Sequence, residues 1–177
     1  DLFGQSTGTA VGAFNGSGLV TSSAGGVSTL SVGNGVTTNG VAGVFSGIIE
    51  NGSGGGVTNV SLATANNTAG QTTTFAFSGL NTYTGSTTLA KTTAGNLVLQ
   101  VNNLADIGVA SGIGKGDATS NATNAASLIF NGGTLTYVGS STAIYDTIGA
   151  KSVSTNRLFT LAGAGTIDSS PTYGNEI

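Results

Sequence analysis

The sequence lacks cysteine, histidine, tryptophan and methionine, and it contains a single proline, Pro171. Without cysteine there can be no disulfide and no thiolate metal site, and without histidine there can be no Ser-His-Asp triad, Cys-His pair or histidine-bound metal. Charge is also scarce, because only 6% of the residues are charged and the net charge is −3. The absence of a basic cluster argues against a nucleic-acid partner.

Long apolar runs are missing too. None approaches the roughly 20 residues of a membrane-spanning helix, so we expect no membrane insertion of this segment. The chain begins at Asp1 without a methionine and shows no signal peptide, which is typical of a processed chain or an excised fragment.

Glycine, serine, threonine and asparagine together fill more than half of the 177 positions. Disorder is a poor explanation, because 38% of the residues are hydrophobic and charge is low. Threonine, valine, isoleucine and phenylalanine favour pleated strands, while glycine and asparagine tolerate positive-φ corners. This composition predicts a single all-β domain over residues 1–177, with many tight turns and essentially no helix.

One short motif recurs along the chain: a brief apolar strand that ends in Asn-Gly, Asn-Asn or Gly-Gly, followed by another strand. The clearest instances are residues 27–35, 44–52, 96–103 and 127–133. Such a rhythm without intervening helices favours stacked, parallel β-repeats, that is, a β-solenoid. Asn-Gly is also a strong hairpin signal, so an antiparallel β-sandwich is the alternative. The broken segments after Asn34-Gly35 and Asn51-Gly52 favour the parallel arrangement.

The pattern predicts weak strands at 11–14 and 19–21, stronger ones at 30–32, 44–45, 48–49, 57–62, 74–77, 86–89 and 97–101, and further strands within 127–138 and 157–168, with a weaker candidate at 144–148. Residues 65–72 are expected to form a loop, and residues 105–126 a larger loop excursion. The side chains expected to face inward are Val32, Phe45, Ile48, Phe77, Leu89, Leu97, Leu99, Val101, Leu128, Phe130, Leu135, Leu158 and Leu161.

Residues 77–89, which read Phe-Ser-Gly-Leu-Asn-Thr-Tyr-Thr-Gly-Ser-Thr-Thr-Leu, are followed by Gly-Asn-Leu-Val-Leu-Gln-Val at 95–101. Together they resemble the autotransporter-associated β-strand repeat, and weaker likeness extends over residues 27–170. The chain departs from that repeat at Ser86, where a second glycine is usual, and at Lys91. The resemblance implies a right-handed parallel β-helix from a large secreted bacterial surface protein.

Candidate chemistry is sparse. The internal carboxylates are scattered along the sequence: Glu50, Asp106, Asp117, Asp146 and Asp168. Glycoside hydrolysis needs two of them within about 5–10 Å, which stacking would produce only by accident. Gly114-Lys115-Gly116-Asp117 lacks the hydroxyl residue of a phosphate loop and reads as a flexible loop. Calcium at Asp106 and Asp117 is conceivable, but the acidic residues are not regularly spaced.

Asn81 and Tyr83 could suggest sugar binding, although an asparagine at a corner and a tyrosine covering its neighbour are the simpler interpretation. Sequons occur at Asn15, Asn51, Asn59, Asn66 and Asn121, as expected by chance in this composition.

The sequence therefore predicts a non-enzymatic structural protein of a bacterial cell surface, acting as an adhesin or a fibre-forming subunit, with no catalytic, cofactor-binding or metal-binding residue. Expected partners are copies of itself or further repeats of a parent chain, with glycans or a host surface also open. The alternative is a carbohydrate-binding or polysaccharide-degrading β-helix.

Overall fold

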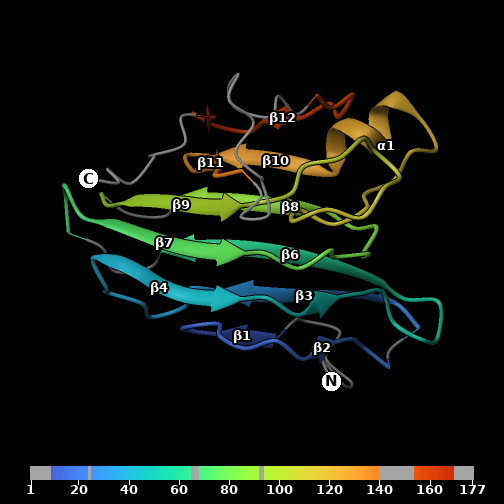
Figure 1. The fold of residues 1–177 in the computed structure, drawn as a ribbon, viewed down its shortest axis with the longest axis horizontal. Helices are drawn as coiled ribbons and strands as arrows, with labels where there is room; N and C mark the ends of the chain where they lie inside the picture. The colour runs from blue at the N-terminus through green and yellow to red at the C-terminus, as the bar shows by residue number, and fades with distance from the viewer. Residues whose placement is uncertain (1–8, 24, 65–67, 92–93, 140–153, 170–177) are drawn as a thin grey trace, which may run out of the picture.

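The computed structural model describes residues 9–23, 25–64, 68–91, 94–139 and 154–169. These residues form an all-β structure in which strands stack in sequence order from one end of the molecule to the other (Figure 1). The candidate strand at 144–148, Asp146 and Asn66 lie outside the described residues.

Two large sheets make up the stack. The six-stranded sheet contains, in spatial order, β1 (Thr9–Val11), β3 (Val27–Val32), β6 (Val57–Thr64), β8 (Thr87–Lys91), β10 (Leu128–Asn131) and β12 (Thr160–Leu161). The five-stranded sheet runs from β4 (Gly40–Phe45) through β7 (Thr72–Phe77), β9 (Asn96–Val101) and β11 (Thr134–Tyr137) to β13 (Thr166–Asp168). A small third sheet pairs β2 (Leu19–Val20) with β5 (Ile48–Ile49).

Every pairing between these strands is parallel. Antiparallel contacts in the described part of the chain are single bridges, Asn81 with Ser111 and Ala90 with Gly132. The antiparallel sandwich is therefore wrong. At the Asn-Gly pairs between apolar runs, the chain turns into a different sheet and does not fold back beside the strand it has just left. Strands that pair with each other are therefore about 25–40 positions apart in the sequence.

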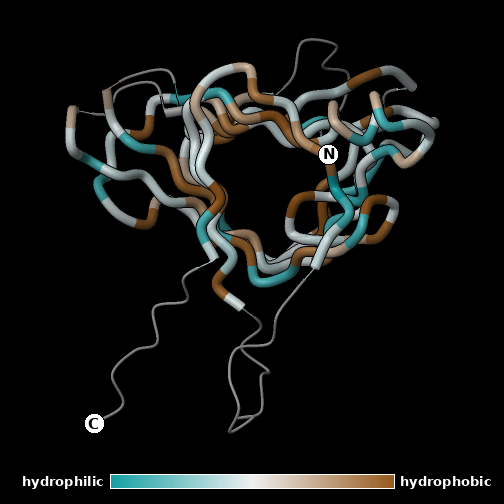
Figure 2. The backbone as a smooth tube through the Cα atoms, turned by 90° about the horizontal axis from the view of Figure 1, so that it is seen from above, coloured by the Kyte–Doolittle hydropathy of each residue, from teal (hydrophilic) through white to brown (hydrophobic). Residues whose placement is uncertain are grey.

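The core consists of columns of apolar side chains that continue from strand to strand. One column follows the register of the six-stranded sheet through Val11, Val32, Leu62, Leu89, Phe130 and Leu161. A second follows the five-stranded sheet through Phe75, Leu99, Leu135 and Ile167. Seen along the stacking direction, the strands of successive repeats superimpose (Figure 2). Alternation along each strand places these residues on one face, where stacking removes them from water.

Ten of the thirteen side chains predicted to face inward are buried: Val32, Phe45, Phe77, Leu89, Leu97, Leu99, Val101, Leu128, Phe130 and Leu135. The prediction was wrong for Ile48, Leu158 and Leu161, which are 42%, 42% and 61% exposed. In β5 it is Ile49 that faces inward, and the alternation before β12 turns Arg157 inward and Leu158 outward. Leu161 continues an inward column, but it lies on the last strand of its sheet.

The excursion at 105–126 contains one element that the sequence did not predict, the short helix α1 (Asn121–Ala126). Ser120 and Thr123 form a capping box at its start. A six-residue helix of small and polar residues has no apolar periodicity to reveal it. No helix in the described ranges is long and apolar enough to cross a bilayer.

Positive-φ corners are formed by glycine alone among the described residues. The expectation that asparagine shares this role is wrong. At Asn34-Gly35, for example, Gly35 has φ +70° and Asn34 does not enter the positive region. The asparagine side chains instead hydrogen-bond to the backbone of neighbouring repeats, which stabilises the corners without the cost of a strained Cβ.

Candidate functional site

The most unusual polar group of the structure is the guanidinium of Arg157, which comes from the segment before β12 and is only 9% exposed. It faces backbone carbonyls of the 105–126 excursion rather than a carboxylate. Nε donates to Ala105 O at 2.8 Å, and Nη2 donates to Val109 O at 3.0 Å and Gly114 O at 2.8 Å. Further bonds from Nη2 reach the carbonyls of Asp106 and Lys115. This residue therefore ties two segments about 50 positions apart.

Burial lowers the pKa of Arg157 by desolvation, while Tyr83 and Asp106 act in the opposite direction. Nη1 is buried and has no hydrogen-bond partner in the structure. The guanidinium of Arg157 occupies the space between these carbonyls. The hydrogen bonds that Nε and Nη2 donate to them compensate for the cost of removing the charge from water. This arrangement is suited to holding the 105–126 excursion against the segment before β12.

Tyr83 lies beside this cluster and is completely buried. Its hydroxyl is 2.6 Å from Thr87 Oγ1, which in turn donates to Ile113 O at 2.9 Å. Burial raises the pKa of the Tyr83 phenol above its ordinary value, because the phenolate would be desolvated. The ring also packs against Gly114, where an added Cβ would lie 2.5 Å from Cε2 of Tyr83. Tyr83 is therefore a core residue and cannot stack on a sugar.

The segment Gly114-Lys115-Gly116-Asp117 does not form a phosphate cradle. The backbone N–H groups of Lys115 and Gly116 both donate to Tyr83 O, at 2.8 and 3.1 Å, and that of Gly114 donates to Ser111 O. Its carbonyls at 114 and 115 accept from Arg157. Since these backbone N–H groups are already used, they are not available to cradle a phosphate.

Asn81 is fully buried and connects three repeats. Its Oδ1 accepts a hydrogen bond from Ile49 N at 2.8 Å, and its Nδ2 donates to Gly112 O at 3.0 Å. The interpretation of Asn81 as a corner residue is confirmed, and the sugar-binding one is wrong.

The acidic residues do not converge. Asp106 Oδ1 accepts from Asn156 N, and Asp117 Oδ1 accepts from the backbone N–H of Thr119 at 2.8 Å. Hydrogen bonds from Thr119, its hydroxyl first, lower the pKa of Asp117. No group of three or more potential metal ligands occurs among the described residues. The four internal carboxylates that the structure describes, Glu50, Asp106, Asp117 and Asp168, therefore form no cluster of three or more.

The sequons of the described residues differ in availability. The side chains of Asn51 and Asn59 are partly buried and bonded to neighbouring repeats. Asn15 is exposed, but its Oδ1 accepts from Val44 N at 2.9 Å, and Asn121 is exposed at the start of α1.

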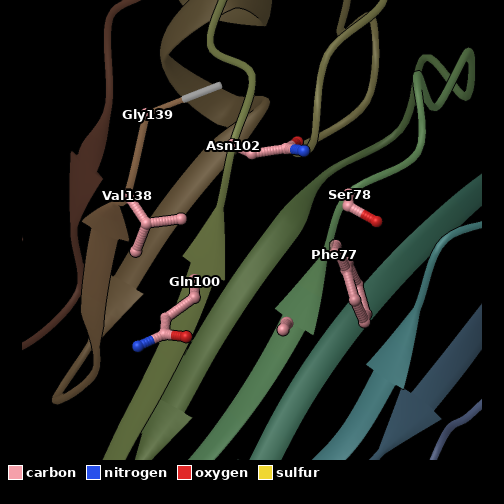
Figure 3. A pocket seen from close by; sticks show the side chains of 7 residues that line it. Phe77, Ser78, Gln100, Asn102, Val138 and Gly139 are labelled. Carbon is pink, nitrogen blue, oxygen red and sulfur yellow. The ribbon is translucent and has the colours of Figure 1, made fainter. Parts of the chain in front are cut away.

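Two surface hollows remain as candidate binding sites. The first, of about 300 Å³, lies across the ends of β7, β9 and β11 (Figure 3). Ser78, Gln100 and Asn102 supply its polar groups, and Ala76 and Val138 supply apolar surface. Asn102 Oδ1 is buried without a partner. The hollow contains no charged side chain and no exposed aromatic ring, since Phe77 is 1% exposed.

The second hollow, of about 400 Å³, lies between α1, residues 84–86 before β8, and strands β6 and β10. Its polar lining includes Asn59, Thr84, Ser86 and Asp117. Asn59 Oδ1 accepts from Ser86 N at 2.8 Å and Asp117 is bonded to Thr119, so both groups already serve the fold. One carboxylate in an open groove does not provide the acid and base that hydrolysis needs.

Sequence reasoning missed Arg157, the residue that organises the 105–126 excursion. The only available signal was a lone arginine in a chain with three lysines and few charges, and a single charge is usually solvated. Its carbonyl partners are backbone atoms, which leave no trace in the pattern of side chains.

Comparison of the chain with protein-family models, with curated proteins and with solved structures finds no match.

Proposed function

We propose that this chain is a non-enzymatic structural segment of an extracellular bacterial surface protein, built as a right-handed parallel β-helix and acting in adhesion or fibre formation. The observation that carries the proposal is the continuous apolar column from Val11 to Leu161, which crosses every strand of the six-stranded sheet. Such a stack buries its core only by adding repeats, which is the logic of repeat proteins with extended shapes. The resemblance of residues 77–101 to the autotransporter-associated repeat supports the same role.

The polar groups support a structural role as well. The asparagines of the corners and the Arg157 guanidinium hold one repeat against another, and the buried Tyr83 hydroxyl bonds Thr87 within its own repeat. Stacks of this kind unfold slowly and resist proteolysis, a property that suits an exposed surface. Partners in this role are further repeats of a parent chain, copies of the same chain, or surface glycans.

The role can be tested by combining protease survival with localisation. Antibodies to the chain should label intact source cells. In a separate experiment, brief protease treatment of the purified chain should leave its repeat region uncut. Labelling that appears only after cells are permeabilised would overturn the extracellular placement. Rapid digestion of the native chain would overturn the structural role.

The alternative, a carbohydrate-binding or polysaccharide-degrading β-helix, is favoured by one observation, the groove beside α1, which is lined by Asp117 and five hydroxyl or amide side chains. A glycan array and a panel of acidic and neutral polysaccharides separate the two. We expect no turnover. If the chain does cleave a polysaccharide, and the variant with Asp106, Asp117, Asp146 and Asp168 all changed to Asn loses that activity, the alternative is correct.

A further inference from the structure

We propose that the last edge of the stack, formed by β12 and β13, binds the first edge, formed by β1 and by residues 14–16, of a second copy of this chain. The contact continues the parallel stacking of strands from one molecule into the next. The inference rests on the proposed structural function and adds the surfaces, the polarity and the register of self-association.

The last edge exposes core-type side chains. Leu161 and Ile167 are 61% and 55% exposed, although they continue the two inward columns of Phe130 and Leu135. Phe159 is 46% exposed and packs edge-on against Phe130, with ring centroids 5.7 Å apart. In the inner strands the same columns are buried because a further strand covers them. An apolar cross-section of this kind is an interaction surface rather than a solvent face.

The first edge offers the matching surface. Val11 begins the column that Leu161 ends, so stacking Val11 of a second copy on Leu161 repeats the contact between neighbouring strands. Phe14 lies half-buried over the core with its ring 4.3 Å from that of Phe45. Among the described residues, no strand pairs with the outer edge of β1, and such an edge is a template for strand addition. The outer edge of β4 is covered by residues 14–16 of the same chain, since Gly16 N donates to Val44 O at 3.0 Å and Ser46 N donates to Gly16 O at 2.8 Å.

The backbone groups at the open edge of β1 also support a second copy as the partner. Val11 O accepts from Gly33 N at 3.0 Å, so the polar groups of Val11 point toward β3. Successive residues of a strand direct their backbone groups to opposite sides, so those of Ala10 point to the open edge. Ala10 is also exposed. A second copy can therefore pair with this edge through the parallel pattern that joins β10 to β12.

The direction of the strands decides whether the second copy stacks head to tail or with its stack reversed. Pairing two last edges about a two-fold axis would set their strands antiparallel, against the pattern of every strand pair in the structure. A head-to-tail contact keeps the strands parallel, and such a contact does not close on itself. Charge does not oppose it, since no charged residue lies between Asp1 and Glu50 and only Asp168 lies within 158–169.

The test uses two variants that each block one edge. Leu161→Lys places a charge on the exposed last edge, and Ala10→Pro removes a donor from the open side of β1 without removing a bond to β3. Sedimentation velocity of the wild-type chain should show species larger than a dimer that grow with concentration. Each variant alone should be monomeric, and their equimolar mixture should form a dimer and nothing larger. Val109→Lys, on an equally accessible apolar residue of the excursion, should assemble like the wild type.

Several outcomes would overturn the inference. A wild-type chain that stays monomeric at its highest soluble concentration would show that other segments of the chain cover these edges. Dimers of Ala10→Pro alone would indicate contact between two last edges, and loss of assembly in Val109→Lys would place the contact elsewhere. Circular dichroism checks that every variant stays β-rich. A β-rich, protease-resistant monomer would leave the proposed function standing while this inference fails.

Discussion

At the scale of single residues, polar side chains act inside this protein as connectors between repeats. Arg157 is the clearest case, because one guanidinium satisfies carbonyls at several points of the 105–126 excursion. Tyr83 acts in the same region by filling the space beside Gly114 and by bonding Thr87. In the sequence Tyr83 could suggest sugar binding and Arg157 looks like a solvated surface charge, but both residues are structural in the fold.

Replacing Arg157 by alanine should destabilise the protein by about 3 kcal/mol, because several buried carbonyls lose their donors at once. Arg157→Lys should recover only part of this loss, since an ammonium lacks the planar fork that reaches separate carbonyls. Denaturant unfolding measures the free energy. Hydrogen exchange should rise first in residues 105–116, and equal increases in β3 would contradict a local role.

Tyr83 should make the protein sensitive to alkali. Its pKa is raised in the folded state, so its contribution to stability is complete below about pH 10, where unfolded tyrosine ionises, and is lost as pH rises toward the folded pKa. In that window stability should fall by about 1.4 kcal/mol per pH unit for this residue.

Tyr83→Phe is the matched control for that pH dependence. It should cost about 1 kcal/mol at neutral pH through the lost bond to Thr87, and it should flatten the decline above pH 10. Urea unfolding from pH 8 to 11 makes the comparison. An unchanged alkaline slope in the variant would mean that Tyr83 ionises as freely in the native state as in the unfolded one.

At the scale of elements, the short distance between stacked repeats requires glycine where the backbones of two repeats come into contact. Gly18, Gly47 and Gly79 lie in successive repeats, and a Cβ added at Gly79 would lie 1.7 Å from Gly47 O. At Gly47 it would lie 1.9 Å from Gly18 O. These corners leave no room for a side chain because the backbone of one repeat lies directly on the next.

Gly79→Ala should therefore destabilise the fold by more than about 3 kcal/mol or prevent it from forming, since a backbone clash cannot be relieved by a rotamer change. Gly18→Ala is the control, because nothing lies within 4 Å of its added Cβ. It should change stability by less than about 0.5 kcal/mol. Thermal unfolding of the pair makes the test, and equal melting temperatures would contradict the close stacking.

Leu99 tests the packing of the five-stranded sheet. It is completely buried between Phe75 and Leu135, so Leu99→Ala should cost about 2–5 kcal/mol. Gln100→Ala, on the opposite face of β9, should cost less than about 0.5 kcal/mol. A loss below about 0.5 kcal/mol for Leu99→Ala would place this residue outside the core.

At the scale of the whole molecule, each repeat contacts only the repeats beside it, so stability is expected to vary along the stack. Strands in the middle have neighbours on both sides, whereas β1, β12 and β13 lie at sheet ends. The polarity of the stack also gives the two ends different surfaces, with the larger exposed apolar residues at β12 and β13.

Native-state hydrogen exchange should show this gradient. Backbone amides of β6, β7, β8 and β9 should exchange with the largest free energies, and those of β1, β12 and β13 with the smallest. If the head-to-tail contact forms, raising the protein concentration should selectively slow exchange in the end strands. Uniform protection along the whole chain at low concentration would contradict nearest-neighbour stacking.

The sequence by itself determined the strands and most of the core. Alternation in residues 97–101 correctly predicts β9 and its buried face. The rhythm of short strands and the broken segments after Asn34-Gly35 and Asn51-Gly52 favour parallel stacking, which the strand pairs confirm. These features are local, since period-two alternation and turn residues act within a few positions.

Only the tertiary structure decided which residues share a repeat and which ends stay open. Arg157 finds its carbonyl partners across about 50 positions, and Leu161 is exposed despite its inward register because no described strand follows β12 in its sheet. In β5 the structure also places Ile49 rather than Ile48 in the core. Every residue has a backbone carbonyl, and no residue type marks the end of a stack. The partners of Arg157 and the exposure of Leu161 therefore become visible only once the repeats are stacked in three dimensions.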